Sequence, residues 1–258
     1  SSAMRSILTV SDTWIVAFLY IGTFGSFIGF SAGLALLTKN LFPDIDPTKY
    51  AFLGPLVGAL ARPLGGVISD KLGGAVVTLW TFIGMIAGVF GVIAFIPHNG
   101  VGGDFVMFLA MFLVLFTLTG IGNASTFRMI PIIYLTEHQR AASGRSQAQI
   151  NMDAAKESAA ALGFAGALGA YGGFFIPKMF GSSIALTGSP AAALPVFFVF
   201  YLSCIALAWW HYARPQAPSP SPTSRPPASA RWRNAAGCRA ATAGRPPGPC
   251  PPRRPARR

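Results

Sequence analysis

Six apolar runs, each long enough to cross a lipid bilayer, constrain the fold of this chain more than any other feature. The runs extend over residues 13–37, 50–68, 75–96, 105–134, 159–180 and 193–212. A helix needs about twenty predominantly apolar residues to span the hydrocarbon core. The chain is 52% hydrophobic and only 11% charged, which is typical of a polytopic membrane protein. We therefore expect an all-α membrane protein with one bundle of six transmembrane helices over residues 1–212.

The fourth run is too long for one simple crossing. Gly120, Gly122 and Pro131 make it the most irregular of the six. Proline cannot donate a backbone hydrogen bond and its ring crowds the preceding turn, so we expect Pro131 to end or kink this helix. The last turn of the run would then project from the membrane.

Residues 213–258 differ from the rest of the chain in composition. They contain ten arginines and no acidic residue, and they are rich in proline and alanine. Without these ten charges the net charge of +12 falls to +2 for residues 1–212. A segment with so few apolar residues predicts a disordered tail. Its arginines would bind anionic lipid headgroups more easily than nucleic acid, so no nucleic-acid partner is expected, and a solvated extension without function is the simpler interpretation.

Lysines and arginines between the runs predict how the chain crosses the membrane. Cytoplasmic loops are the richer in these residues. Six lie on one side, namely Arg5, Lys71, Arg140, Arg145, Lys156 and Arg214, and three on the other, namely Lys39, Lys49 and Lys178. This count and the even number of runs predict that both termini lie on the cytoplasmic side of the cell's inner membrane. The opening SSAMRSIL carries no secretory signal and looks like the interior of a longer chain.

Arg62 is a lone arginine in the second apolar run, within the stretch AFLGPLVGALARPLGGVISDKLGG. A guanidinium near the bilayer centre costs about 3 kcal/mol on insertion scales, so such residues usually face a polar cavity or a partner. Its planar fork of donors suits a small planar anion. The alternative is that Arg62 reaches the headgroups near Ser69 and Asp70, about two helical turns further on. Against that alternative, neighbouring glycines would let other helices approach and keep the side chain in protein; these are Gly54, Gly58, Gly65 and Gly66.

A short motif follows the Arg62 run. GGVISDKLGG contains Gly66, Asp70, Lys71 and Gly73, and it resembles the cytoplasmic loop signature of the major facilitator superfamily. In that superfamily the acidic residue and its basic neighbour take part in interhelical contacts that hold one state of the transport cycle. By resemblance, these four residues form a conformational loop motif.

The fifth run carries the more specific resemblance. ALGFAGALGAYGGFFIPKMFGSS has glycines at 163, 166, 169, 172 and 173 followed by the sequence FFIP, and it resembles the nitrate signature of the nitrate/nitrite porter family. FGSFIGFSAGLALLTKNLFP, AFLGPLVGALARPLGG and TGIGNASTFRMIP resemble other parts of that family's carboxy-terminal half. The resemblance covers residues 12–212. It implies that the six helices form one half of a major facilitator fold.

Small residues at three- and four-residue spacing give the fifth helix a smooth face. Such a face can slide or rock against its neighbour and expose backbone to a small ligand. Ordinary close packing is the alternative, and for any single glycine it is the favoured one. The cluster as a whole carries the functional expectation.

The resemblance also implies a substrate site. In this family the anion lies between two six-helix halves, clasped by one arginine from each half and stacked on aromatic rings. The implied substrate-binding residues are Arg62, Tyr20, Phe24, Gly166, Gly169, Gly172 and Gly173. Tyr20 and Phe24 are four residues apart and share a helical face. Arg128 would be a gate contact or a positive-inside anchor, and the anchor is favoured.

The function implied by resemblance is nitrate uptake with nitrite export by alternating access, in nitrate assimilation. This chain would supply half of the site, and a missing amino-terminal six-helix half would be its partner. The runs contain no buried Asp or Glu that could relay protons, which favours antiport over proton symport. A half for another small anion and a non-transporting membrane fragment are the alternatives.

Signals of enzyme chemistry are lacking in the sequence. No cluster of His, Cys, Asp or Glu has metal or nucleophile spacing, and there is no P-loop, so we expect no cofactor, no metal and no enzymatic activity. Cys204 lies in an apolar run, whereas Cys238 and Cys250 lie in the tail. These positions do not form a disulfide framework, and three free thiols are predicted.

Overall fold

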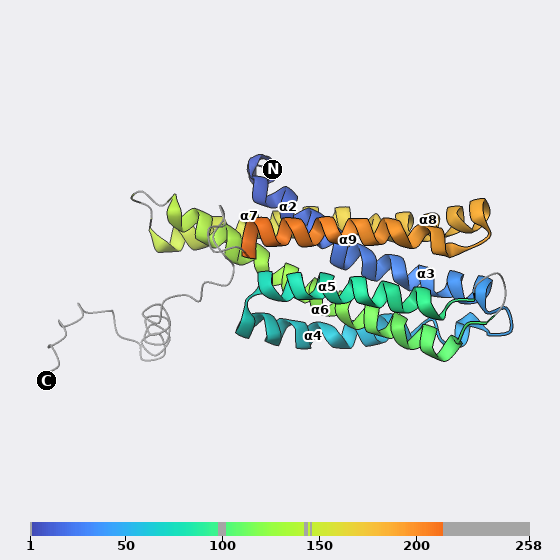
Figure 1. Ribbon diagram of the computed structural model, residues 1–258. Coiled ribbons are helices and arrows are strands. Elements are labelled where there is room, and N and C mark those ends of the chain that lie inside the picture. Colours follow the sequence, from blue (N-terminus) through green and yellow to red (C-terminus); the bar gives the residue numbers. More distant parts are fainter. Residues whose placement is uncertain (1, 98–101, 142–143, 145, 214–258) are drawn as a thin grey trace, which may run out of the picture. The chain divides into compact units, whose positions relative to one another are not determined.

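The computed structural model describes residues 2–97, 102–141, 144 and 146–213 (Figure 1). The predicted disordered tail lies outside these residues, apart from its first position, and so do Cys238 and Cys250. Cys204 is a buried free thiol.

Helices account for nearly all the described residues, and those residues contain no β-strand. The α-helices are α1 (Ser2–Thr9), α2 (Ser11–Tyr20), α3 (Ser26–Leu41), α4 (Leu53–Leu72), α5 (Gly74–Phe95), α6 (Phe105–Arg140), α7 (Gln147–Ala170), α8 (Gly172–Thr187) and α9 (Leu194–Ala208). Two π turns extend them, η1 (Ile21–Gly25) and η4 (Trp209–Ala213), and two short 3₁₀ turns are η2 (Pro47–Lys49) and η3 (Pro190–Ala193).

Six helical segments among the described residues are long and apolar enough to cross a membrane. They are Ser11–Leu41, Pro47–Leu72, Gly74–Phe95, Phe105–Arg140, Gln147–Thr187 and Leu194–Tyr212. The prediction of an all-α membrane protein with six transmembrane helices is confirmed. Figure 1 shows the spans lying side by side along one direction, as expected for half of a major facilitator fold.

The fourth span differs from its prediction. Helix α6 continues through Pro131 to Arg140, so of the two effects predicted for this proline, an end or a kink, the end is wrong. Ile130, Ile133 and Tyr134 are buried around the proline. Packing of this turn against its neighbours maintains the helix where the local preference opposes it, because tertiary contacts supply most helical stability.

The fifth span consists of two helices that meet at Tyr171. A capping box of Ser146 and Gln149 starts α7 well before the apolar run that predicted it. At the start of α8 the backbone of Gly172 lies against the backbone of Gly25, where a β-carbon would overlap it. The glycines therefore let α8 approach η1 and α3 closely.

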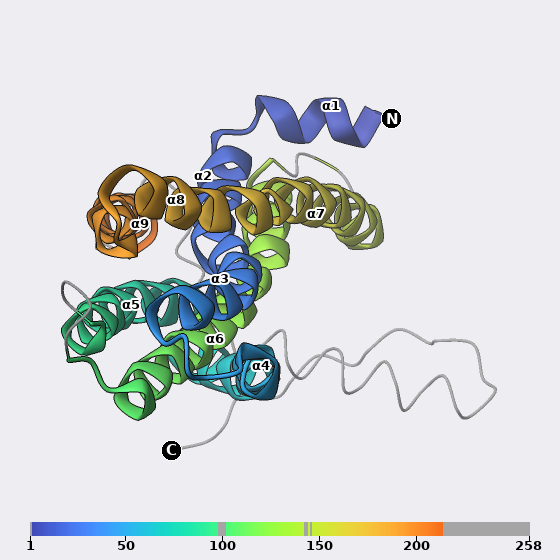
Figure 2. The same ribbon diagram turned by 90° about the vertical axis from the view of Figure 1, so that its right-hand side faces the viewer.

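Helix α6 lies at the centre of one part of the bundle, where it packs against both α4 and α5, while α8 packs against α3 (Figure 2). Phenylalanines fill the space between α3 and α6, with the Phe30 and Phe112 rings edge to face at a centroid distance of 5.9 Å. We call the end of the bundle where α2 begins and α6 finishes the α1 end, because α1 packs there against α7.

Candidate substrate site around Arg62

Arg62 points from α4 toward α6, because it shares a helical face with glycines that pack against α6. Gly58 and Gly65 lie one turn to either side of it. A β-carbon at Gly65 would lie 2.6 Å from the Ile121 α-carbon, and one at Gly58 would lie 2.8 Å from the Phe116 carbonyl oxygen. The two helices can approach this closely only because these side chains are absent. Arg62 is therefore half-buried between helices.

A cavity of about 650 Å³ lies beside α4, on the side from which Arg62 projects. It is lined by Tyr20, Ala59, Arg62, Pro63, Gly66, Val67, Asn123, Ala124, Phe127 and Arg128. No carboxylate is among these lining residues, whereas two arginines are. The cavity is therefore electropositive and suits an anion.

Asn123 of α6 joins Arg62 to Tyr20. One orientation of its amide satisfies both neighbours: the oxygen accepts from Arg62 Nε (3.1 Å) and Nη2 (3.0 Å), and the nitrogen donates to the Tyr20 hydroxyl (3.1 Å). The Asn123 side chain is buried, with 5% of the residue exposed. This contact uses two of the five N–H donors of Arg62 and leaves three for a ligand.

Aromatic rings form the other side of the Arg62 site. The guanidinium carbon lies 4.6 Å from the Phe27 ring centroid and 5.9 Å from that of Phe24. The Tyr20 and Phe24 rings are neighbours, with centroids 5.2 Å apart. Faces of aromatic rings attract a guanidinium without neutralising its charge. The rings of Phe24 and Phe27 therefore help to hold the arginine in place without lining the cavity, whereas Tyr20 lines it.

The alternative that Arg62 reaches toward the lipid headgroups does not fit these contacts. Its side chain is bound to Asn123 and stacked near Phe27. Sequence reasoning missed both partners. Phe27 follows Tyr20 by seven residues and Phe24 by three, which is the spacing of one helical face and could have indicated it. Asn123 is on another helix, and only its position within the TGIGNASTFRMIP segment was a signal.

The glycines of the fifth span lie behind the aromatic residues or away from them. A β-carbon at Gly169 would lie 2.8 Å from the Phe24 ring and 3.5 Å from that of Tyr20. Gly172 and Gly173 pack against Gly25 and Ile28. No atom lies within 4 Å of a β-carbon built at Gly166. None of these four glycines lines the Arg62 cavity.

The loop motif lies at the α1 end of the Arg62 cavity. Asp70 forms an ion pair with Arg128, with Nη1 and Oδ1 2.7 Å apart. Gly66 lies opposite the Arg128 guanidinium, whose Nη2 is 3.7 Å from where a β-carbon of residue 66 would be. Gly73, at φ 93°, ends α4 in a conformation that favours glycine, and Lys71 is exposed. Arg128 was expected to be mainly a positive-inside anchor, but this ion pair makes it an interhelical contact between α6 and α4.

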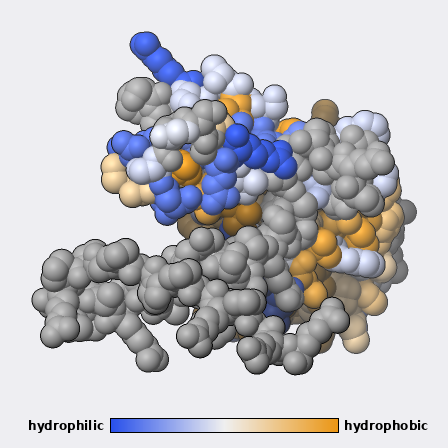
Figure 3. Space-filling view, turned by 90° about the vertical axis from the view of Figure 1, so that its left-hand side faces the viewer, coloured by the Kyte–Doolittle hydropathy of each residue, from blue (hydrophilic) through white to orange (hydrophobic). Residues whose placement is uncertain are grey.

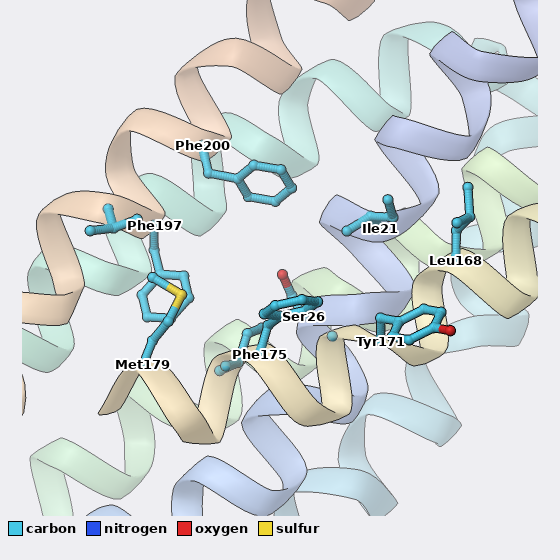
Figure 4. A pocket seen from close by; sticks show the side chains of 11 residues that line it. Ile21, Ser26, Leu168, Tyr171, Phe175, Met179, Phe197 and Phe200 are labelled. Atoms are coloured by element: carbon cyan, nitrogen blue, oxygen red, sulfur yellow. The ribbon is translucent and has the colours of Figure 1, made fainter. Parts of the chain in front are cut away.

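A second cavity, of about 400 Å³, is lined by α8, α9 and η1 (Figure 4). Its lining is apolar, with Phe175, Met179 and Phe200 around it and the Tyr171 hydroxyl pointing away. The Ser26 hydroxyl is bound to the Tyr201 hydroxyl at 2.7 Å. No charged residue lines this cavity, so it has no charged group that would attract an anion.

Carboxylates occur at the α1 end, which corrects the expectation that the spans contain no buried Asp or Glu. Asp12, 9% exposed, lies 2.5 Å from His211, and Glu157 lies 2.9 Å from His138. The sequence pattern missed them because they flank the apolar runs. Figure 3 views this end and shows hydrophilic residues gathered in its upper part, where α1 and α7 lie. Neither carboxylate lines the Arg62 cavity.

Known proteins resemble this chain closely over part of their length. No protein-family model matches it. It is 48% identical to the nitrate/nitrite transporter NarU of Escherichia coli (strain K12) over 204 residues, which are 78% of this chain and 44% of the relative. NarU of Salmonella typhimurium is 50% identical over the same shares of the two chains. The probable nitrate/nitrite antiporter NarK2 of Thermus thermophilus is 36% identical over 212 residues, which are 81% of this chain and 43% of the relative. The chain spans less than half the length of these curated relatives.

Proposed function

Because the chain belongs to the nitrate/nitrite porter family of the major facilitator superfamily, we propose that it supplies the carboxy-terminal half of a nitrate/nitrite transporter. The matched residues make up only 44% of the NarU relatives, so a second six-helix half would complete the molecule. Two such halves that rock about a central site would give alternating access. In this proposal the chain is a transport protein and not an enzyme, and it acts with the amino-terminal half and the surrounding lipid.

One observation carries the proposal: Arg62 has neutral partners and faces an electropositive cavity. Three of its N–H donors are not used by Asn123, and they form a planar fork beside the rings of Phe24 and Phe27. Nitrate and nitrite are small planar anions whose oxygens can accept from such a fork. An apolar ring face beside the fork disfavours bulkier or tetrahedral anions.

The site in this proposal consists of Arg62, Tyr20 and Phe24, with Asn123 and Phe27 as supports. Gly169, Gly172 and Gly173 serve it indirectly, because they let α7 and α8 pack behind the aromatic residues. Gly166 has open space beside it, which the second half or the substrate would occupy in the complete transporter.

Exchange of nitrate for nitrite fits the chemistry of the cavity better than proton symport. Arginine keeps its charge at physiological pH, so Arg62 does not relay protons. The carboxylates of Asp12 and Glu157 do not line the cavity. Their proximity to histidines at the α1 end supports a structural role for both carboxylates.

The distribution of basic residues supports the proposed orientation. Arg5, Lys71 and Arg140 lie in α1 and at the ends of α4 and α6 that belong to the α1 end, and Lys156 lies in α7. On the other side of the count, Lys39 and Lys49 flank the loop between α3 and α4, and Lys178 lies in α8. By the positive-inside rule the α1 end faces the cytoplasm. The chain would then lie in the cell's inner membrane with both termini of the six-helix bundle on the cytoplasmic side.

Nitrate uptake into nitrite-loaded proteoliposomes tests the proposal. The chain alone is compared with the chain joined to a six-helix amino-terminal half from its own gene. Uptake only by the joined form, with acetate transported poorly, is the expected result. Acetate uptake equal to that of nitrate would favour a half for another small anion, and no uptake of either would favour a non-transporting fragment.

A further inference from the structure

Two arginines from different helices line the cavity, and Arg128 offers the same planar fork of donors as Arg62. Arg128 lines the same 650 Å³ space from α6. It follows Asn123 by five residues, which places it about 7.5 Å further along the helix axis, toward the α1 end. An anion that moves between Arg62 and that end of the bundle therefore passes the second guanidinium.

The Arg128 guanidinium can enter the path because of the residue opposite it. Gly66 follows Arg62 by one turn of α4, and the Arg128 Nη2 lies 3.7 Å from where a β-carbon would be. Without a side chain at residue 66, the guanidinium lies along the surface of α4 and reaches Asp70, one further turn on. An alanine β-carbon there would only reach ordinary contact with the guanidinium, whereas a side chain larger than alanine would displace it from the cavity.

The ion pair that holds Arg128 is easily exchanged. Its side chain is 51% exposed and that of Asp70 is 52% exposed. Ion pairs in such surroundings contribute little free energy, because water screens the charges and both side chains are mobile. An oxyanion in the cavity can therefore compete with the Asp70 carboxylate for the same donors.

We propose that Arg128 is a second anion-binding residue of this cavity, which receives a small planar oxyanion at the α1 end while Asp70 competes for the same guanidinium. This inference rests on the proposed transport function. Pairing with Asp70 neutralises Arg128 when no anion is present. A residue with a built-in competitor binds its anion weakly, which suits a step on a pathway that must also release the ion.

A purely structural interpretation makes a different prediction. If the ion pair only fastened α4 to α6 in one state, removal of either partner would have the same effect on transport. If Arg128 binds the anion, removal of Arg128 weakens apparent affinity, and removal of Asp70 strengthens it. The two substitutions then act in opposite directions.

Nitrate uptake by the joined transporter is measured in right-side-out and inverted vesicles, as a function of nitrate concentration on the outer side. Arg128→Gln should raise the half-saturating nitrate concentration about tenfold, in the orientation that exposes the α1 end. Asp70→Asn should lower it about twofold to threefold on the same side. Arg128→Lys should fall between wild type and Arg128→Gln, because it keeps the charge and loses the fork.

Lys156 lies in α7 and does not line the cavity. Lys156→Gln therefore removes a positive charge elsewhere in the protein, and it controls for net charge. Each variant is compared at equal amounts of monodisperse protein. Equal changes in the same direction for Arg128→Gln and Asp70→Asn would overturn the inference, as would no change in either or the same change in Lys156→Gln. Wild-type vesicles that fail to take up nitrate would overturn the proposed function itself, and the inference with it.

Discussion

Arg62 is held by groups that carry no charge. Its partners are the Asn123 amide oxygen and the rings of Phe24 and Phe27, and it forms no ion pair with a carboxylate among the described residues. Neutral partners position a guanidinium while leaving its charge available. A carboxylate at the same distance would have positioned it equally well but would have competed with an anion.

Replacement of Arg62 by lysine tests whether geometry matters as well as charge. Arg62→Lys should reduce nitrate uptake by the joined transporter at least tenfold, about the value of one hydrogen bond to a charged group, because an ammonium cannot form the bidentate contact. Membrane insertion, measured from the amount of folded protein after detergent extraction, should stay at the wild-type level. Uptake at the wild-type rate would exclude a substrate role for this residue.

Asn123 allows a sharper test, because aspartate has the same shape. Asn123→Asp should abolish most nitrate uptake, since a carboxylate about 3 Å from the guanidinium would neutralise it. Tyr20→Phe, which removes only the hydroxyl on the other side of the amide, should have the smaller effect on uptake. If Asn123→Asp transports nitrate as wild type does, the Arg62 charge is not what attracts the anion.

The glycines of the fifth span are of two kinds. Some are in close contact with a neighbouring element, and others have open space beside them. Gly172 touches the backbone of Gly25, while Gly163 and Gly166 have nothing within 4 Å of a β-carbon position. A smooth helical face is thus only partly used within this half. The open part is at Gly163 and Gly166 of α7, and the close part begins at Gly169 and continues where α8 meets η1 and α3.

Alanine substitutions should separate these two kinds of glycine. Gly172→Ala should lower the free energy of unfolding by about 1–3 kcal/mol, because the methyl group overlaps the Gly25 backbone. Gly163→Ala is the matched control on the same span, and it should be neutral or stabilising, because alanine is the better helix former. The measurement is the midpoint of thermal unfolding in detergent. Equal midpoints for the two variants would show that α8 is free to shift away.

The same comparison at Gly166 separates packing from function. Gly166→Ala should leave the unfolding midpoint unchanged. Loss of nitrate uptake in such a stable variant would assign Gly166 to the substrate or to the second half.

At the scale of the whole bundle, polar contacts at the α1 end connect spans that are distant in sequence. Asp12 of the first span contacts His211 of the last, and Thr13 lies 2.5 Å from the hydroxyl of Tyr134 in the fourth. Glu157 of the fifth span accepts from Ser6 of α1 at 2.7 Å and contacts His138. These buried and part-buried groups bind one another, which makes the network a structural support of this end.

Neutral variants of the carboxylates test whether this network relays protons. Asp12→Asn and Glu157→Gln should keep nitrite-driven nitrate uptake, because neither residue lines the Arg62 cavity, and each should lower the unfolding midpoint. Uptake is compared with and without an imposed pH gradient. If uptake disappears while the unfolding midpoint stays normal, proton coupling through the α1 end replaces exchange as the mechanism.

The sequence by itself determined the membrane class, the six helices and the family, and it predicted a site at Arg62. Run length and hydrophobicity are local properties, and they decide by themselves whether a segment can span the bilayer. Tertiary structure decided the rest: α6 continues through Pro131 because packed neighbours hold that turn, and Asp12 is buried although it flanks its run. Asn123, Phe27 and the Asp70–Arg128 ion pair belong to the site through contacts between helices. Such contacts depend on how closely glycines let helices approach and how each helix is rotated, and spacing along a single helix does not contain that information.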